Sequence, residues 1–289
     1  MDAALLVQVV LNGILLGALY ACIAAGFSLV WGVLNVINML HGSLIILAGY
    51  LACSLWTEWQ VHPLAAMLPV GLLLFLAGTA LQVLLINRVV DRPVLTTLTL
   101  TFGLDMVLYN AMNAAFEATP RRVTLELGRL TLGEVVLPWD RIVAMLLALA
   151  LTGLLYGVLR ASRLGRAIVA VRMDREAASL MGIRVARIYA LTFGLGAFMA
   201  GVCGALLAVV YPITTNATGQ LLGKAFIVCV VGGLGTVPGA LAGGLALGVT
   251  ESLGGHFLGP QAAALLGFGL MLVLLVVRPT GLLGRKGYE

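Results

Sequence analysis

The stretch VRMDREAASLMGIRVAR, at residues 171–187, stands out because charged residues make up only 10% of the chain. Residues 160–187 contain seven arginines and two acidic residues, so their net charge of +5 equals the formal net charge of the whole chain. Charged side chains are costly in hydrocarbon. The stretch therefore marks a segment outside any apolar environment, and the sequence on either side decides what that environment is.

Apolar residues dominate the rest of the chain. Of its 289 residues 61% are hydrophobic, and the mean hydropathy is +1.09, whereas a soluble domain is nearer half apolar and a quarter charged. A membrane-crossing helix needs about 20 apolar residues. The candidate segments are residues 5–30, 40–56, 63–86, 94–115, 141–159, 188–211, a broken region at 221–256, and 261–277. They predict an all-α polytopic membrane protein with about eight transmembrane segments, and a single domain over residues 1–289 because no polar linker divides the chain.

Basic residues predict the orientation, because cytoplasmic loops carry an excess of Lys and Arg. Residues 160–187 have the largest basic bias and are placed in the cytoplasm. Counting the predicted spans from there puts the N-terminus on the outer side. The C-terminal tail, with Arg278, Arg285 and Lys286, is placed inside.

A segment near residues 120–138 alternates apolar and polar residues, which is typical of a β-hairpin. Gly128 lies where a turn would fall. The apolar positions are Val123, Leu125 and Leu127 before the glycine, and Leu130 and Leu132 after it. The orientation places this hairpin outside the cytoplasm.

Residues 231–240, VGGLGTVPGA, interrupt the apolar region at 221–256, because four glycines and Pro238 cannot sustain one helix. An outer residue 211 and an inner residue 278 require an odd number of crossings, which two short helices or a re-entrant pair plus the last span satisfy. Broken helices often build transporter sites, so Gly232, Gly233 and Gly235 are candidates for the translocation path. The glycines do not match a phosphate-binding loop. The chain is therefore expected to bind no cofactor, and any ATP use belongs to another chain.

Polar residues between the first two apolar runs are a second set of candidates for the translocation path. Asn38, His41 and Ser43 lie in NVINMLHGSLI, at residues 35–45, and such groups need partners in hydrocarbon. They indicate either a polar helix–helix turn near the cytoplasmic surface or an interrupted helix that lines the path. His41 is far in sequence from His62 and His256, so no metal-ligand spacing is present.

Asp105 lies inside the apolar segment TLTLTFGLDMVLYN, which makes it a functional candidate by default. It would either pair with a substrate ammonium group or accept hydrogen bonds from Thr99 or Thr101. Lys224 and Glu251 raise the same question. The sequence shows no grouping typical of a catalytic site, so an enzyme is not expected.

The charged stretch contains a short helix, predicted near residues 174–182. Asp174 is a plausible N-cap, Glu176 lies in the first turn where the helix dipole favours an acid, and Gly182 can end the helix. Ala177 and Ala178 keep its surface slim. A slim helix on the cytoplasmic side suits a groove on a soluble partner, while a solvated interfacial loop is the alternative.

Two further patterns predict close packing. Gly13 and Gly17, like Gly244 and Gly248, are small residues four positions apart, a spacing that lets helices approach closely. The four cysteines stand singly in apolar runs and are expected to be buried packing residues.

Several motifs resemble those of one transporter family. Glu176-Ala177-Ala178, three residues and Gly182 resemble the E-A-A-x-x-x-G signature of ABC importer permeases, although the usual Leu-Pro downstream is absent. INMLHG at 37–42, GKAFIVCVVGGLGTVPGALAGG at 223–244 and RPTGLLG at 278–284 resemble the branched-chain amino-acid ABC transporter permeases of the LivH type. Met39 and Leu40 replace the usual Phe-Ala, and Asp105 stands where a neutral or hydroxyl residue is expected.

The resemblance implies a multi-pass subunit of the bacterial inner membrane that carries branched-chain amino acids. Its partners would be a second homologous permease, two cytoplasmic ATPases that bind ATP-Mg, and a periplasmic solute-binding protein. The residues that would contact the ATPases are Asp174, Arg175, Glu176, Ala177, Ala178 and Gly182. Two alternatives remain open: import of urea or another small amide, and an ion-coupled carrier that uses Asp105 and Glu251.

Overall fold

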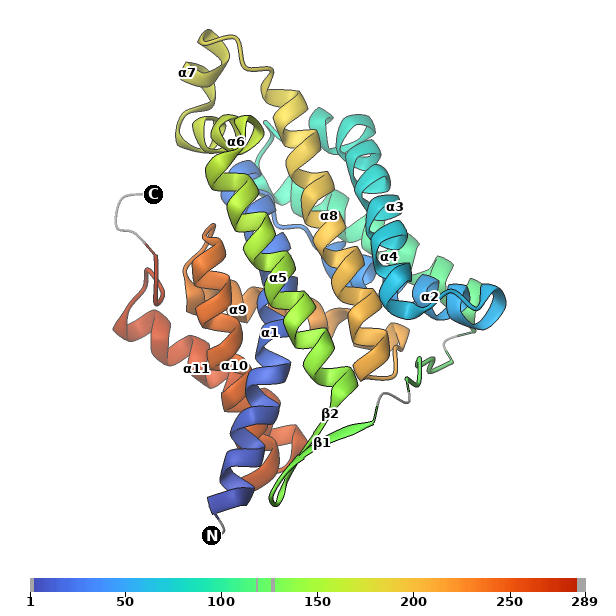
Figure 1. Cartoon of the computed structure of the whole chain (residues 1–289). Coiled ribbons are helices and arrows are strands. Elements are labelled where there is room, and N and C mark those ends of the chain that lie inside the picture. The colour runs from blue at the N-terminus through green and yellow to red at the C-terminus, as the bar shows by residue number, and fades with distance from the viewer. Residues whose placement is uncertain (1–2, 118, 126–127, 285–289) are drawn as a thin grey trace.

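A computed structural model describes residues 3–117, 119–125 and 128–284 (Figure 1). Its helices are α1 (Ala3–Leu34), α2 (His41–Trp59), α3 (Pro63–Leu84), α4 (Val94–Phe116), α5 (Trp139–Ala161), α6 (Arg163–Met173), α7 (Arg175–Leu180), α8 (Val185–Val210), α9 (Thr218–Gly232), α10 (Val237–Phe257) and α11 (Pro260–Val277). Two 3-10 turns, η1 (Ile86–Arg88) and η2 (Thr215–Ala217), and two strands, β1 (Arg129–Leu132) and β2 (Val135–Pro138), complete the chain order. The predicted mostly helical architecture is confirmed.

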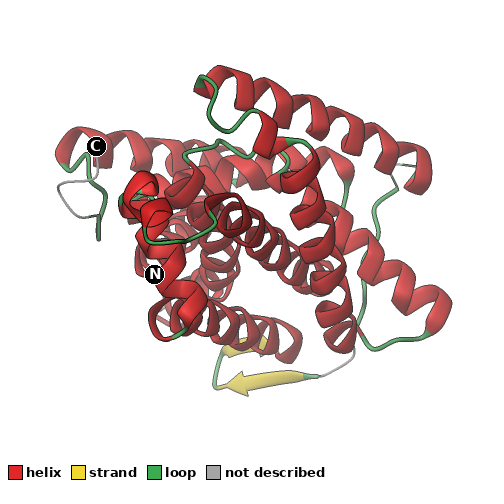
Figure 2. Cartoon of the chain, turned by 90° about the horizontal axis from the view of Figure 1, so that it is seen from above, coloured by secondary structure: helices red, strands yellow, loops and turns green. Residues whose placement is uncertain are grey.

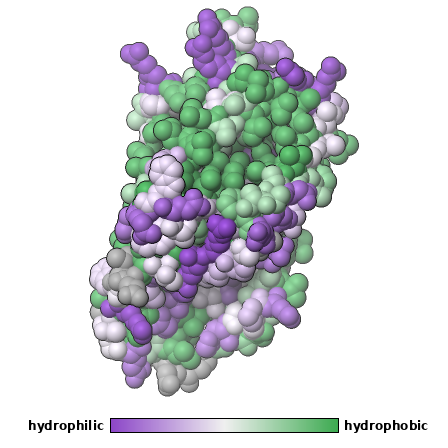
Figure 3. Space-filling model, turned by 90° about the vertical axis from the view of Figure 1, so that its right-hand side faces the viewer, coloured by the Kyte–Doolittle hydropathy of each residue, from purple (hydrophilic) through white to green (hydrophobic). Residues whose placement is uncertain are grey.

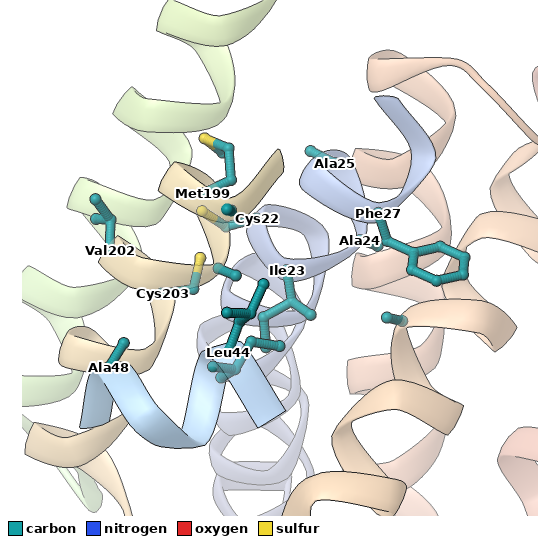
Figure 4. Packing of buried hydrophobic residues seen from close by; sticks show 14 of the residues in the cluster. Cys22, Ile23, Ala24, Ala25, Phe27, Leu44, Ala48, Met199, Val202 and Cys203 are labelled. Carbon is teal, nitrogen blue, oxygen red and sulfur yellow. The ribbon is translucent and has the colours of Figure 1, made fainter. Parts of the chain in front are cut away.

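Helix α8 lies at the centre of the bundle. In its most apolar window 89% of residues are buried, against 11% in α4 and α11, which lie at the periphery. Figure 4 shows side chains of α1, α2 and α8 meeting in the core, among them Cys22, Leu44 and Cys203. All four cysteines are buried free thiols, as expected from their isolated positions in apolar runs.

Within the described residues, six helices are long and apolar enough to cross a membrane, and α9 and α10 add a pair bent by 113°. The prediction of about eight spans counted residues 40–56 as one, but α2 is not among the six. His41, at the start of α2, hydrogen-bonds to the carbonyl of Ile23. Because Ile23 lies eleven residues before the end of α1, about 16 Å along the helix axis, α2 begins deep inside the bundle.

Helices α1 and α10 run antiparallel with their backbones in contact. A Cβ at Gly13 would lie 2.7 Å from Val249 Cα, and one at Gly17 would lie 2.8 Å from the Gly244 carbonyl oxygen. A Cβ at Gly248 would overlap Gly17 Cα. The predicted close packing by small residues is therefore confirmed, and any larger side chain here would force the two helices apart.

The predicted interruption near residues 231–240 is present: α9 ends at Gly232 and α10 begins at Val237. We refer to residues 233–236 as the helix break. The C-terminal segment closes over it, because the amides of Leu282 and Leu283 donate to the carbonyls of Val231 and Gly232 at 2.8 and 2.9 Å. These carbonyls are at the end of α9 and would otherwise lack helical partners.

The predicted hairpin is present, but its turn was placed wrongly. β1 pairs antiparallel with β2 in a register that sets Leu132 opposite Val135, so the turn is at Gly133 and Glu134 rather than at Gly128. Gly128 also has a positive φ, of 81°, so each glycine suits a turn, and the strand register selects Gly133. Leu127, in the predicted pattern, is outside the described residues.

The hairpin and α7 lie at opposite ends of the molecule, and Ala3 is at the hairpin end (Figure 1). Figure 2, the view from above, shows the two strands at the edge of the helical bundle. The side chain of Gln8 in α1 fixes the hairpin by bonding both the amide and the carbonyl of Val136. The molecule therefore has two distinct end faces, one that carries the hairpin and one that carries α7.

A broad apolar surface separates these faces. Figure 3 shows it on the right-hand side of the view in Figure 1, where α3 and α4 lie, with hydrophilic side chains above it. Leu72, Leu76 and Val107 are each more than half exposed there. An exposed apolar belt between two polar faces is the surface expected of a polytopic membrane protein.

Candidate functional site

The short helix α7 forms where the sequence predicts it. Asp174 has extended backbone geometry, and its Oδ1 accepts hydrogen bonds from the amides of Glu176 and Ala177 at 2.8 and 3.0 Å. This is the geometry of an N-cap. Gly182 follows the helix with φ of 82°, a conformation that favours glycine. Both predicted boundary signals are thus confirmed as structure.

The surface of α7 is largely uncovered. Leu180 and Met181 are 90% and 83% exposed, while Ala178 is buried against the rest of the chain. A groove of about 460 Å³ runs beside them, lined by residues that include Asp91, Arg175 and Leu180. Apolar side chains on a projecting polar helix mark a surface suited to a protein partner.

Two arginines connect this region to the membrane helices. Arg175 forms an ion pair with Asp91, between η1 and α4, at 2.6 Å. A hydrogen bond with Tyr189 and the nearby Asp91 carboxylate raise the pKa of Arg175. Arg172, in the last turn of α6, donates from Nη1 to the carbonyl of Gly235 at 2.6 Å. The sequence signals did not single out Arg172, because its partner lies 63 residues away.

The candidate path glycines lie at the helix break. Gly233 and Gly235 have φ values of 109° and 74°, which L side chains rarely adopt. A Cβ at Gly232 would overlap the carbonyl of Gly239 in α10. A Cβ at Gly235 would lie 3.1 Å from Gly32 Cα, at the end of α1. The glycines therefore allow α9 to meet α10, and the helix break to meet α1, backbone to backbone.

The polar residues after α1 form a second group. Asn38, His41 and Ser43 are fully buried, and Ser43 Oγ donates to Asp105 Oδ1 at 2.5 Å. Thr101 donates to the carbonyl of Ile37 at 2.9 Å. We call Asn38, His41, Ser43, Thr101 and Asp105 the polar cluster. It joins the α1–α2 connection to α4.

Of the two interpretations of this segment, the surface turn does not fit. His41 lies at the depth of Ile23 rather than at the end of α1, and Ser43 is fully buried. Asn38 Oδ1 and His41 Nδ1 are buried and, within the described part of the chain, have no hydrogen-bond partner. An unpaired buried polar group costs about 1–3 kcal/mol, so these two atoms carry unused hydrogen-bonding capacity within the cluster.

The threonines of α4 have different roles from those predicted. Neither donates to Asp105: Thr101 bonds Ile37, and Thr99 bonds the carbonyl of Leu95 on its own helix. Thr99 is exposed and lies on the opposite side of α4 from Thr101 and Asp105. Of the six candidates outside the glycines and α7, five therefore form the polar cluster at the α1–α2 connection and α4, and Thr99 lies apart.

A cavity of about 480 Å³ adjoins both groups on the α7 side. Its lining includes Asn35 and Val36 beside the polar cluster, Thr97 one turn before Thr101, and Arg172 beside the helix break. The candidates at the helix break and those in the polar cluster form separate groups, and residues next to each group line this cavity.

Lys224 and Glu251, noted as charges in apolar segments, pair with each other. Lys224 Nζ lies 2.9 Å from Glu251 Oε2, and Tyr20 Oη donates to the same oxygen at 2.7 Å. The sequence could have indicated this ion pair, because Lys224 and Glu251 carry opposite charges in neighbouring apolar segments. Tyr20 carried no such signal, since it is 204 residues from Lys224.

Comparisons with known proteins agree over nearly the whole chain. The profile of the family described as "Branched-chain amino acid transport system / permease component" matches residues 9–276. The high-affinity branched-chain amino acid transport system permease protein BraD of Pseudomonas aeruginosa is 35% identical, covering 98% of this chain and 97% of the relative. LivH of Escherichia coli, described in the same words, is 34% identical over 98% of this chain and 96% of its own length.

One solved structure shares the fold. PsaBC from Streptococcus pneumoniae, in complex with Fab, aligns with a TM-score of 0.51 at 12% identity, covering 93% of this chain and 92% of that one. At this identity the likeness concerns the fold alone.

Proposed function

The chain belongs to the family of branched-chain amino acid transport system permeases, and we propose that it forms, with a second homologous permease, the path of an ATP-driven importer. Its solutes are branched-chain amino acids. The observation that carries the proposal is α7, a capped helix with exposed apolar residues at the end of the molecule opposite Ala3. Such a helix suits a groove on an ATPase subunit.

The proposed orientation puts α7 in the cytoplasm of a bacterial cell, with the chain in the inner membrane. The arginines around α6 and α7, such as Arg163 and Arg166, support this placement because basic residues favour the cytoplasmic side. The N-terminus is then periplasmic and the C-terminus cytoplasmic. A periplasmic binding protein would deliver the solute to the end that carries the hairpin.

The chain itself carries out no covalent chemistry in this proposal. ATP-Mg binds to two partner ATPases, whose closure moves α7 and shifts the permease between outward-open and inward-open states. The proposed contacts with the ATPases are made by Asp174, Arg175, Glu176, Ala177, Ala178 and Gly182. The solute passes the polar cluster, where Asp105 is placed to attract an ammonium group.

The geometry disfavours an ion-coupled carrier. That alternative needs Glu251 to bind and release a cation, but its Oε2 is already held by Lys224 at 2.9 Å and by Tyr20 at 2.7 Å. A carboxylate with an internal cation partner has less capacity for a transported one.

Reconstituted transport tests the proposal. The chain would be purified with candidate permease and ATPase partners, placed in liposomes with the binding protein, and supplied with radiolabelled leucine. We expect uptake only with hydrolysable ATP, competition by isoleucine and valine, and no competition by urea. An ATPase subunit inactivated at its nucleotide site is the matched control. Uptake by this chain alone, independent of ATP, would refute the proposal.

A further inference from the structure

We propose that Arg172 is a positioning residue that transmits movement of α7 to the helix break. The inference rests on the proposed function, since it concerns how ATP-driven motion reaches the membrane helices. Arg172 is in the last turn of α6, and Asp174 alone separates α6 from α7. Its Nη1 donates to the Gly235 carbonyl at 2.6 Å, so one side chain joins the two regions.

Asp174 makes α6 and α7 move as one body. Its amide donates to the carbonyl of Ala170 in α6, while its side chain caps α7 through the amides of Glu176 and Ala177. A displacement of α7 by a partner is thereby passed to α6 and to Arg172, because no flexible linker lies between them.

Gly235 is enclosed on two sides. A Cβ at this position would lie 2.8 Å from Arg172 Nη2 and 3.1 Å from Gly32 Cα. The guanidinium therefore lies directly against the Gly235 backbone, with the end of α1 beyond it. Any shift of Arg172 must either move the break or open a gap in a packed contact.

The backbone of the break can change its dihedral angles more easily than the helices that flank it. Residues 233–236 lie between two helices bent by 113°, and they form no helical turn of their own. A rigid helix would spread a push along its length, whereas a loop between helices can change its dihedral angles. A push at Gly235 therefore changes the angle between α9 and α10.

The other link from α7 is weaker. The side chains of Arg175 and Asp91 are 55% and 73% exposed, and exposed ion pairs contribute little. The bond from Arg172 is partly buried and ends on a backbone carbonyl, which makes it the stiffer connection.

The test uses the assembled transporter with two reporter positions. Leu180→Cys in α7 and Leu234→Cys in the break would carry spin labels, since both leucines are exposed and the native cysteines are buried. Arg172→Gln removes the charged donor. Arg166→Gln is the matched control, because Arg166 is an exposed arginine of the same helix whose side chain, among the described residues, bonds locally to the carbonyl of Ala161.

We expect ATP to change both label spectra in the unaltered transporter and in Arg166→Gln. In Arg172→Gln the Leu180 label still responds and the Leu234 label no longer does. The amount of leucine transported per ATP hydrolysed falls at least about tenfold, the factor expected for loss of one charge-assisted hydrogen bond. An unchanged Leu234 response and transport ratio in Arg172→Gln would overturn the link.

If Arg172→Gln does not fold, a second variant tests the same link. Gly235→Ala keeps the guanidinium but displaces it, so it should lose the same response while still co-purifying with the ATPases. A normal Leu234 response in Gly235→Ala would also overturn the link. Absence of any ATP response in the unaltered transporter would instead refute the proposed function.

Discussion

The group of Tyr20, Lys224 and Glu251 gives the most quantitative prediction. It joins α1, α9 and α10 within the membrane-spanning part of the chain. Lys224 Nζ donates to Tyr20 Oη at 2.5 Å and pairs with Glu251 at 2.9 Å. The Lys224 side chain is 27% exposed and that of Glu251 only 10%. The carboxylate of Glu251 is therefore more deeply buried than the ammonium group of Lys224.

This inequality predicts different costs for the two single variants. Removing one partner of a buried ion pair destabilises a protein by about 3–5 kcal/mol, because a charge is left without compensation. Lys224→Met leaves the more buried Glu251 uncompensated, and we expect about 3 kcal/mol. Glu251→Gln leaves Lys224, which can extend toward its exposed side, and we expect about 1–2 kcal/mol. The double variant removes both charges and should lose less than Lys224→Met alone.

Thermal unfolding in detergent measures this order. At about 2–3 °C per kcal/mol, Lys224→Met should lower the midpoint by roughly 6–9 °C, and the double variant should recover at least half of that loss. The reasoning fails if the double variant is as unstable as Lys224→Met. It fails also if Glu251→Gln is the less stable of the two single variants.

Three further predictions concern α7 and the polar cluster. Gly182→Ala strains a residue with φ of 82° by about 1–2 kcal/mol, so it should weaken ATPase binding about fivefold to thirtyfold in a titration. Gly157→Ala, at a glycine of α5 that is equally free of contacts, is the control and should bind normally; equal binding by both variants would contradict this. Asp174→Ala removes a cap worth about 1 kcal/mol, so amide exchange in α7 should accelerate about fivefold, and an unchanged rate would count against the cap. Asp105→Asn keeps an acceptor for Ser43 but removes the charge, so the KM for leucine should rise about tenfold; unchanged affinity and rate would return Asp105 to a structural role.

Local signals in the sequence predicted local structure well. Asp174 and Gly182 act on backbone groups within a few residues, so the ends of α7 could be predicted without knowing the rest of the fold. The end of α9 at Gly232 was predictable for the same reason. Spacing of the glycines also predicted close helix packing, because helical geometry alone puts them on one face, but it did not predict that α1 and α10 are the partners.

The contacts that build the candidate site could not be predicted in this way. Ser43 and Asp105 are 62 residues apart, and Arg172 and Gly235 are 63 apart. Apolar composition also could not show that α2 starts at the depth of Ile23, since a run of suitable length reads the same wherever it begins. Tertiary packing decides each of these features.

The contacts of α1 indicate which part of the bundle responds to a push at the break. Helix α10 meets α1 backbone to backbone at Gly13 and Gly17, so it has little freedom to slide. Helix α9 contacts α1 through side chains, such as Lys224 against Tyr20, and meets α10 backbone to backbone at Gly232 and Gly239. Side chains can change rotamer while remaining in contact, so α9 can tilt relative to α1.

Tilting of α9 would act on the polar cluster. The carbonyl of Thr218, at the start of α9, lies against Gly42 at the start of α2, and Asn216 just before it accepts a hydrogen bond from Tyr109 in α4. One end of α9 therefore adjoins the break that Arg172 contacts, and the other adjoins the two helices that hold Ser43 and Asp105. A rotation of α9 about its packed middle moves both ends at once, which would link the state of α7 to the exposure of Asp105.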